Sequence, residues 1–278
     1  MEPWLIPALL ALVAWSLQRV VAKVALATLS TPQFYFLSAV VSFPVYLPVL
    51  LLDPPPLSAF PGAIGVAALV ALTFGITTEA LRRGPVGRVS PITGLSPALT
   101  ALLAITILGE RMGGVRLTGV ATATVAVVLL GYQRRSGQAR EGWLMLAIAS
   151  VVLQGLGAFL SKVVVTPSGP SALLVTSASV QVVVGGALVR RSNASYPAFH
   201  TPLMRLTIFV LGLAALATIG YLWALSVGPA AVIVPLVATS PALGGLIGSF
   251  VLREPRSRLQ CAGIALGLLA AILLAMPE

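Results

Sequence analysis

Four polar or aromatic side chains share one otherwise apolar stretch near the start of the chain. They are Trp15, Gln18, Arg19 and Lys23. In a helix, residues three, four and eight positions after Trp15 lie on the same side as its ring. A ring offers a stacking surface and a glutamine offers neutral hydrogen-bonding groups, so Trp15 and Gln18 are candidate contacts for a small organic ligand.

Two later apolar stretches carry further candidates for the same ligand. Gln154 and Phe159 belong to one stretch, and Tyr221 and Trp223 belong to the other. Polar groups inside such stretches are costly and call for a function or a partner. The predicted site is a surface of aromatic rings and neutral amides that suits an amino acid. The alternative is structural, with rings that fill core space and glutamines that hydrogen-bond to neighbouring backbone.

Proton coupling would need a carboxylate inside an apolar stretch, and six of the seven carboxylates lie at termini or connections. The exception is Glu79, which precedes Arg82 and Arg83 by three and four residues. An ion pair along a helix is the predicted role of Glu79, and coupling to protons is the alternative. The sequence thus favours passive or weakly coupled flux. We expect Glu110 and Glu254 to cap or pair at short connections.

Catalysis, metal binding and cofactor binding find no support in the sequence. His200 is the one histidine and Cys261 the one cysteine, so no His–Glu metal motif or paired-thiol site can form. A nucleophile elbow and a phosphate-binding Gly-Lys-Ser/Thr loop are also missing from the sequence. We expect Cys261 to be a buried apolar thiol. No cofactor is expected, and an integral membrane enzyme is a distant second class.

The composition points to lipid as the main solvent of the chain. Of the 278 residues, 58% are hydrophobic and 9% are charged, and the mean hydropathy is +1.03. A soluble domain carries about a quarter charged residues, because its surface must face water. The net charge of +10 comes from basic residues that stand in pairs at the ends of apolar stretches. This pattern is typical of topology signals, and no nucleic-acid partner is expected.

Ten apolar stretches of helical length follow one another, each close to the roughly 20 residues that cross a bilayer as a helix. We place them near 4–27, 33–52, 62–81, 88–108, 115–133, 143–164, 171–189, 204–225, 230–252 and 258–276. The predicted fold class is all-α integral membrane, with ten transmembrane helices. The first stretch lacks a basic leader and a small-residue cleavage site, so a signal peptide is not expected.

An internal repeat relates the two halves, because adding 144 to a position in the first half finds a similar residue in the second. The pairs include Gly84-Pro85 with Gly228-Pro229, Pro91 with Pro235, Ser96-Pro97 with Ser240-Pro241, Glu110 with Glu254, and Gly119 with Gly263. We divide the chain into five-helix repeats at 1–139 and 140–278. Five spans is an odd number, so the second repeat is inverted, as in many secondary transporters with a site between their repeats.

Four prolines stand at equivalent places in spans four and nine. They are Pro91, Pro97, Pro235 and Pro241. Each removes a backbone donor, so these spans are predicted to bend and to line a vestibule where the freed carbonyls find partners or water. The alternative is that the prolines only shape packing. Small-residue pairs such as Gly244 with Gly248, and Gly263 with Gly267, are expected to serve internal packing rather than a dimer interface, and a monomer is expected.

These motifs resemble the EamA repeat of the drug/metabolite transporter superfamily. The resemblance rests on Gly84-Pro85 through Ser96-Pro97, on Leu108-Gly109-Glu110-Arg111, and on a weaker second copy that has Arg253-Glu254-Pro255. Ala14-Trp15-Ser16 followed by Lys23 resembles the opening pattern of the family. The resemblance implies two inverted five-helix repeats around a central cavity from spans one, three, four, six, eight and nine. Within the superfamily the chain is most similar to the YddG-type aromatic amino-acid exporters.

The predicted function is export of small organic solutes, aromatic and other neutral amino acids first, across the inner membrane by alternating access. One alternative is exchange of an anionic metabolite, such as a phosphorylated or nucleotide-linked sugar, on an anion clamp of Arg19, Lys23 and Lys162. Another alternative is a broad drug exporter. The expected partners are the small-molecule substrate and the lipid bilayer.

The basic residues predict how the chain is oriented. Connections after the odd-numbered spans carry twelve arginines, and the opposite side carries only Arg111 and Arg116. Short loops rich in Lys and Arg stay in the cytoplasm, so both termini are predicted to be non-cytoplasmic. The resemblance implies instead that both termini lie inside. Trp4 and Trp143 stand at span starts, where interfacial anchoring is expected.

Overall fold

The computed structural model describes residues 2–26, 28–83, 86–131, 141–192, 201–252 and 257–276. Twelve helices and no strand occur in these ranges. They are α1 (Leu5–Ala25), α2 (Thr31–Leu52), α3 (Ala59–Arg83), α4 (Val86–Thr93), α5 (Ser96–Ile107), α6 (Gly114–Gly131), α7 (Trp143–Ser168), α8 (Ser171–Ser192), α9 (Pro202–Val227), α10 (Ala230–Ala238), α11 (Ser240–Leu252) and α12 (Arg258–Ala275).

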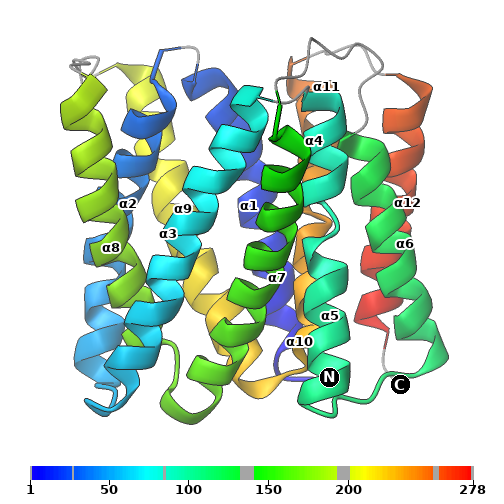
Figure 1. The fold of residues 1–278 in the computed structure, drawn as a ribbon, viewed down its shortest axis with the longest axis horizontal. Helices are drawn as coiled ribbons and strands as arrows, with labels where there is room; N and C mark the ends of the chain where they lie inside the picture. Colours follow the sequence, from blue (N-terminus) through cyan, green and yellow to red (C-terminus); the bar gives the residue numbers. More distant parts are fainter. Residues whose placement is uncertain are drawn as a thin grey trace.

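The helices form a membrane bundle, as the composition predicted. Nine helical stretches in the described residues are long and apolar enough to cross a bilayer, with α10 and α11 counted as one. The tenth predicted span is made by α4 together with the short apolar helix α5. Large apolar side chains such as Phe209, Val183 and Met145 point out of the bundle, where a lipid environment accepts them. The helices lie side by side, and both termini meet at one end of the bundle, the termini end (Figure 1).

Local sequence signals fix several helix starts. The Ser30 hydroxyl accepts a hydrogen bond from the Gln33 amide, and the Gln33 side chain accepts one from the Ser30 amide, which forms a capping box at α2. Ser257 and Gln260 form the same box at α12. These caps satisfy amides that have no partner within the helix, so the helices begin at the residues where the apolar stretches begin.

Spans four and nine are each broken into two helices. The first break lies between α4 and α5 at Gly94 and Leu95, and the second lies between α10 and α11 at Thr239. Pro97 and Pro241 are the second residues of α5 and α11, where a missing backbone donor costs nothing. The predicted bend is thus an interruption, and these two prolines start new helices instead of kinking old ones. Pro235 stays inside α10, and the side chain of Pro91 lies outside the described residues.

The repeat detected in the sequence is also a structural repeat. Helix α6 spans residues 114–131 and α12 spans residues 258–275, which is an offset of 144 at both ends. The halves pack crosswise, with α1 on α9, α7 on α3, α2 on α8 and α6 on α12. Helix α1 leaves the termini end, whereas α7 runs toward it, so the second half is inverted relative to the first (Figure 1).

Glycines bring helices of this bundle into close contact. A side chain at Gly244 would lie 3.0 Å from the carbonyl oxygen of Ser16, so α11 can approach α1 only because Gly244 has none. At Gly263 an added Cβ would lie 3.1 Å from the carbonyl oxygen of Ala126 in α6. The small-residue pairs therefore serve internal packing, as predicted. Cys261 departs from its prediction, because its thiol is exposed on α12 rather than buried.

Candidate functional site

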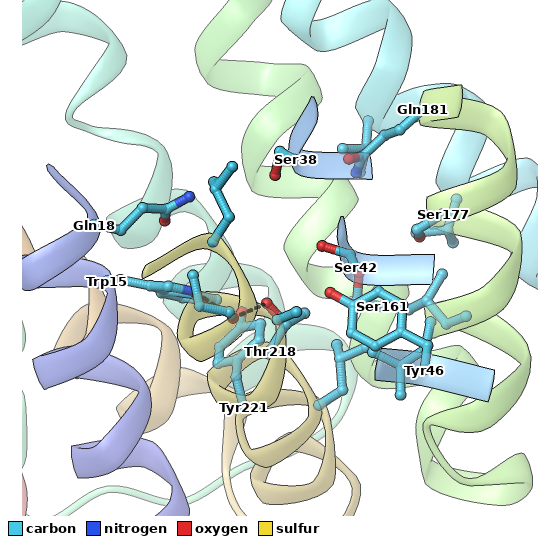
Figure 2. A pocket seen from close by; sticks show the side chains of 18 residues that line it. Trp15, Gln18, Ser38, Ser42, Tyr46, Ser161, Ser177, Gln181, Thr218 and Tyr221 are labelled. Atoms are coloured by element: carbon cyan, nitrogen blue, oxygen red, sulfur yellow. Dashed lines mark hydrogen bonds between the residues drawn. The ribbon is translucent and has the colours of Figure 1, made fainter. Parts of the chain in front are cut away.

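A central cavity of about 260 Å³ lies among α1, α2, α3, α7, α8 and α9. Most of its lining side chains with polar atoms are hydroxyls and amides, and Figure 2 shows them around a common space. They are Trp15, Gln18, Ser38, Ser42, Tyr46, Ser161, Ser177, Gln181, Thr218 and Tyr221. Aliphatic residues such as Val70 and Leu211 complete the walls.

One wall of the central cavity is aromatic. The rings of Trp15 and Tyr221 lie 5.1 Å apart between centroids with an interplanar angle of 57°. The Trp15 indole N–H donates to the carbonyl oxygen of Ala214 at 3.4 Å, and the Thr218 hydroxyl donates to the same oxygen at 2.9 Å. The Trp15 bond joins α1 to α9 and holds the indole at the cavity (Figure 2). The wall offers a π-face to a ring or an apolar side chain of a ligand.

The opposite wall was not anticipated from the sequence. Ser38, Ser42 and Tyr46 line it from α2, and Ser177 and Gln181 line it from α8. The hydroxyl of Tyr46 lies close to the side chains of Ser42 and Thr218. Spans two and seven therefore contribute to the cavity, although the family resemblance implied other spans. The missed signal is a spacing of four, which places Ser38, Ser42 and Tyr46 on one side of a helix.

None of the described residues that line the central cavity is charged. Ser and Thr hydroxyls and glutamine amides both donate and accept hydrogen bonds, so this surface can bind neutral polar groups in either sense. It has no group suited to transfer a proton near neutral pH, because the hydroxyls and amides are neutral there. The arrangement can bind and release a small solute without chemical change.

A connecting cavity of about 300 Å³ adjoins the central cavity and shares Val70 and Ser161 with it. Gln154 lies in this second space and bridges three helices. Its amide nitrogen donates to the Thr77 hydroxyl at 3.2 Å, and its oxygen accepts from the Ser96 hydroxyl at 3.2 Å. Gln154 thus ties α7 to α3 and to the first residue of α5.

The Arg19 cavity, of about 440 Å³, continues from the connecting cavity, with which it shares Ser96, Pro97 and Gln154. Its lining comes from both broken spans, through Thr93 at the end of α4 and Pro241 at the start of α11. Each of the three cavities shares lining residues with the next, and together they form a path through the bundle. Arg19 is the charged residue among the described side chains that line this path.

The structure brings together some of the predicted site residues and separates others. Trp15, Gln18 and Tyr221 line the central cavity, and Gln154 lines the connecting and Arg19 cavities. Phe159 is buried in the core, and Trp223 is 40% exposed on the outer face of α9. Neither of these two rings lines the path, because Phe159 packs within the bundle and Trp223 faces outward. Their inclusion among the predicted contacts is corrected on this geometry.

Two of the four prolines line the path, and Glu79 lies away from it. Pro97 lines the connecting and Arg19 cavities, and Pro241 lines the Arg19 cavity, whereas Pro235 is buried within α10. Glu79 lies away from the path, where its carboxylate accepts hydrogen bonds of 2.6 Å from Arg82 and from Arg83. The predicted ion pair along the helix is confirmed.

Lys162 is bound to backbone carbonyls rather than placed in the predicted anion clamp. Its ammonium donates to the carbonyl oxygens of Leu225 at 2.7 Å and Gly228 at 2.8 Å, which are at the C-terminal end of α9. Its ammonium is therefore engaged by backbone and does not belong to an anion clamp. The side chain of Lys23, and also Glu254 and His200, lie outside the described residues.

The Glu110 carboxylate caps the start of α10, the helix that follows the α9–α10 turn. Glu110 accepts hydrogen bonds from the amides of Ala230 at 2.9 Å and Ala231 at 2.8 Å, the first two residues of α10. Gly109 has a φ of +68°, a left-handed conformation that ends α5 and turns Glu110 toward α10. The expected capping role of Glu110 is confirmed, and it lies across the repeat boundary.

Buried side chains seal the termini end further. Trp4 is only 3% exposed and packs against Gly228, so it is not the interfacial anchor that was expected. The Arg116 guanidinium lies 5.6 Å from the centroid of the Trp4 ring and pairs with Glu2 at 2.6 Å. Aromatic and ionic contacts thus close this end around the α9–α10 turn.

The two ends of the bundle differ, although the repeats are related. At the termini end α5 packs against α10, and α7 packs against α9. The repeat-equivalent pairs at the opposite end are α11 with α4 and α1 with α3. Neither pair makes comparable contacts among the described residues. The termini end is therefore the more closed one, and the Arg19 cavity lies toward the less tightly packed end.

An inverted-repeat bundle of membrane-spanning helices with a polar path at its centre defines the class of membrane transporters. The model of the EamA-like transporter family matches residues 2–132 and 141–276, and the chain belongs to this family. No curated protein matches the chain. Among the solved structures, one described only as "Crystal structure of protein" matches with a TM-score of 0.74 and 16% identity, over 97% of this chain and 95% of that chain. That likeness extends to the fold.

Proposed function

We propose that the chain exports amino acids, aromatic and other neutral ones first, across the inner membrane by alternating access. The observation that carries the proposal is the central cavity. An aromatic wall of Trp15 and Tyr221 faces a wall of hydroxyl and amide groups, and the described part of the chain places no charged residue in the space between them. A ring would find a stacking surface there, and the ammonium and carboxylate of a zwitterion with no net charge would find hydrogen-bonding partners in the hydroxyls and amides.

The size of the central cavity suits a small solute. Its volume of about 260 Å³ lies near the lower bound of the roughly 300–1,000 Å³ of sites that enclose drug-sized molecules. An amino acid therefore fits within this one space, and a nucleotide-linked sugar or a large drug would also have to occupy the neighbouring cavities.

Alternating access is supported by the unequal ends of the bundle. Because the repeats are inverted, each helix pair that closes one end has a repeat-equivalent pair at the other end, which packs less closely among the described residues. A second conformation would pack α4 against α11 and release α10 from α5. We propose the two halves, 1–139 and 140–278, as the units that exchange conformations.

Passive or weakly coupled flux follows from the charges of the path. Glu79 lies outside it and pairs with two arginines, and no other described carboxylate lines any of the three cavities. Coupling to protons usually relies on an ionisable carboxylate or histidine at the site. Solute gradients alone would then drive export.

The test is efflux from proteoliposomes loaded with radiolabelled phenylalanine, tryptophan, threonine or a cationic dye. We expect saturable efflux of the amino acids in the absence of a counter-substrate, with the aromatic ones preferred. Flux that requires a counter-substrate would favour the exchanger. Efflux of the dye without that of amino acids would overturn the proposal in favour of a drug exporter.

A further inference from the structure

We propose that Arg19 is the anion subsite of the transport path and binds the carboxylate of the transported solute. The inference rests on the proposed function, because it names the part of an amino acid that the Arg19 cavity recognises. It goes beyond that function by assigning a charged group of the path to a defined chemical partner.

Arg19 is an intramembrane cation that faces the path. It lies four residues after Trp15 on α1 and six before the end of that helix at Ala25, which places it about 9 Å inside the span. Arg19 lines the Arg19 cavity, and its side chain is exposed rather than enclosed by the protein. A guanidinium keeps its charge, so this position is costly unless it has a function.

The protein does not neutralise this charge within the described residues. The Arg19 Nε–H donates to the Ser240 hydroxyl at 3.3 Å, which is a neutral partner. The described ion pairs involve Arg82, Arg83 and Arg116 instead. A guanidinium has five N–H donors, so those on its two terminal nitrogens remain for a ligand. Their planar fork fits the two oxygens of a carboxylate.

Two helix N-termini add to the positive potential of the same cavity. Ser96 starts α5 and Pro241 is the second residue of α11, and both line the Arg19 cavity. A helix N-terminus carries partial positive charge and attracts anions. Gly244, whose added Cβ would lie 3.6 Å from Cβ of Arg19, lets α11 pack beside this residue. A guanidinium next to a helix N-terminus is unfavourable by itself, and an anion between them would stabilise both.

The surroundings favour a carboxylate over a phosphate. The other polar groups that line the Arg19 cavity, among the residues that the structure describes, are neutral and include Thr77, Ser90 and Thr93. One guanidinium balances a monoanion, whereas a phosphate ester carries nearly two charges at neutral pH. Lys162, which the predicted anion clamp included together with Lys23, is held by two backbone carbonyls away from the path. We infer that the acid group of an amino acid meets Arg19 before its side chain reaches Trp15.

The experiment compares an acid with its amide on the purified full-length protein. Phenylalanine and phenylalaninamide have the same ring and amine, and differ at the group that Arg19 would bind. Binding is measured by the shift of the thermal unfolding midpoint and by tryptophan fluorescence titration, for wild type, Arg19→Gln and Arg19→Lys. Arg205→Gln is the matched control, because Arg205 is exposed at the start of α9 and lines none of the cavities.

We expect wild type to bind phenylalanine at least about tenfold more tightly than phenylalaninamide, as charge-assisted hydrogen bonds allow. Arg19→Gln should remove that preference by weakening phenylalanine alone, and Arg19→Lys should retain part of it. Arg205→Gln should behave as wild type. Equal binding of acid and amide by wild type would overturn the proposal. Loss of both ligands in a folded Arg19→Gln protein would overturn it too, because that outcome indicates a structural role.

Two simple anions separate this proposal from the proposed function. If wild type binds and transports neither phenylalanine nor its amide, benzoate and inorganic phosphate are titrated in the same assay. Arg19-dependent binding of benzoate keeps the carboxylate subsite and rejects the amino-acid assignment. Stronger Arg19-dependent binding of phosphate overturns the carboxylate assignment in favour of a phosphorylated solute. Failure of both anions to bind overturns the subsite itself.

Discussion

Lys162 and Glu110 hold opposite sides of one turn. The Lys162 ammonium donates to two carbonyls at the end of α9, and the Glu110 carboxylate accepts from the first two amides of α10. Each charge lies where the helix dipole favours it, a cation at a C-terminus and an anion at an N-terminus. Glu110 belongs to the first half of the chain, and Lys162 and the turn belong to the second. The Glu110 contacts therefore tie the two halves together at the termini end.

Loss of the Glu110 carboxylate should loosen this end. Glu110→Ala removes two charge-assisted bonds to amides, so we expect about 1–2 kcal/mol of lost stability. The measurement is thermal unfolding of the purified protein in detergent. Accessibility gives a second readout, in a background that carries Cys261→Ser and Ser161→Cys. A membrane-impermeant thiol reagent added from the termini end should label the cysteine at position 161 faster when Glu110→Ala is also present. Glu141→Ala is the control, because Glu141 is exposed. Unchanged labelling and stability would remove Glu110 from the closure of this end.

The aromatic wall predicts a contrast between two tryptophans. Trp15→Ala should weaken apparent affinity for an aromatic amino acid by several fold, because a stacking or cation–π contact contributes about 0.5–2 kcal/mol. Trp223→Ala should leave affinity unchanged, since that ring lies on the outer face of α9. Efflux kinetics at matched membrane abundance give the comparison. Equal effects of the two substitutions would contradict the assignment of the wall.

Gln154 should matter for rate more than for affinity. Its side chain bridges Thr77 and Ser96 and lines the connecting and Arg19 cavities, not the central one. We expect Gln154→Ala to lower the maximal efflux rate with little change in the half-saturating concentration. Thr77→Val removes one of the two bonds and should give a smaller decrease. A decrease confined to apparent affinity would place Gln154 in the binding site instead.

Glu79 tests the passive mechanism. Because its carboxylate is already paired with Arg82 and Arg83 outside the path, Glu79→Gln should leave downhill efflux intact while reducing stability slightly. The measurement is phenylalanine efflux with and without an imposed pH gradient. Strict dependence on the gradient in wild type, abolished in Glu79→Gln, would make Glu79 the proton site.

Orientation in the membrane follows from the arginine count. Helices α3 and α8 finish at the end opposite the termini end, and the odd-numbered spans are followed by twelve arginines, so we predict that this end faces the cytoplasm and that both termini do not. Alkaline phosphatase and a fluorescent protein, each fused after Glu278, test this. We expect phosphatase activity and a dark fluorescent fusion. Bright fluorescence without phosphatase activity would reverse the orientation.

The sequence by itself determined the spans and the repeat. Continuous apolar stretches and the offset of 144 were sufficient, because a bilayer leaves a helix as the only way to satisfy the backbone of such a stretch. Span bounds agree with the helices to within four residues. The sequence also determined the pairing of Glu79 with Arg82 and Arg83, because contacts within one helix depend only on spacing.

Only the tertiary structure decided which side of each helix faces the path. Trp15 and Trp223 look alike in sequence, yet one lines the central cavity and the other faces outward. Ser38, Ser42 and Tyr46 look like ordinary span residues, yet they form a wall. Hydropathy gives no direction to a helix that is apolar on all sides, so its neighbours fix its rotation. The partners of Lys162 and Glu110 lie more than sixty residues away in the chain, which placed them beyond any local pattern.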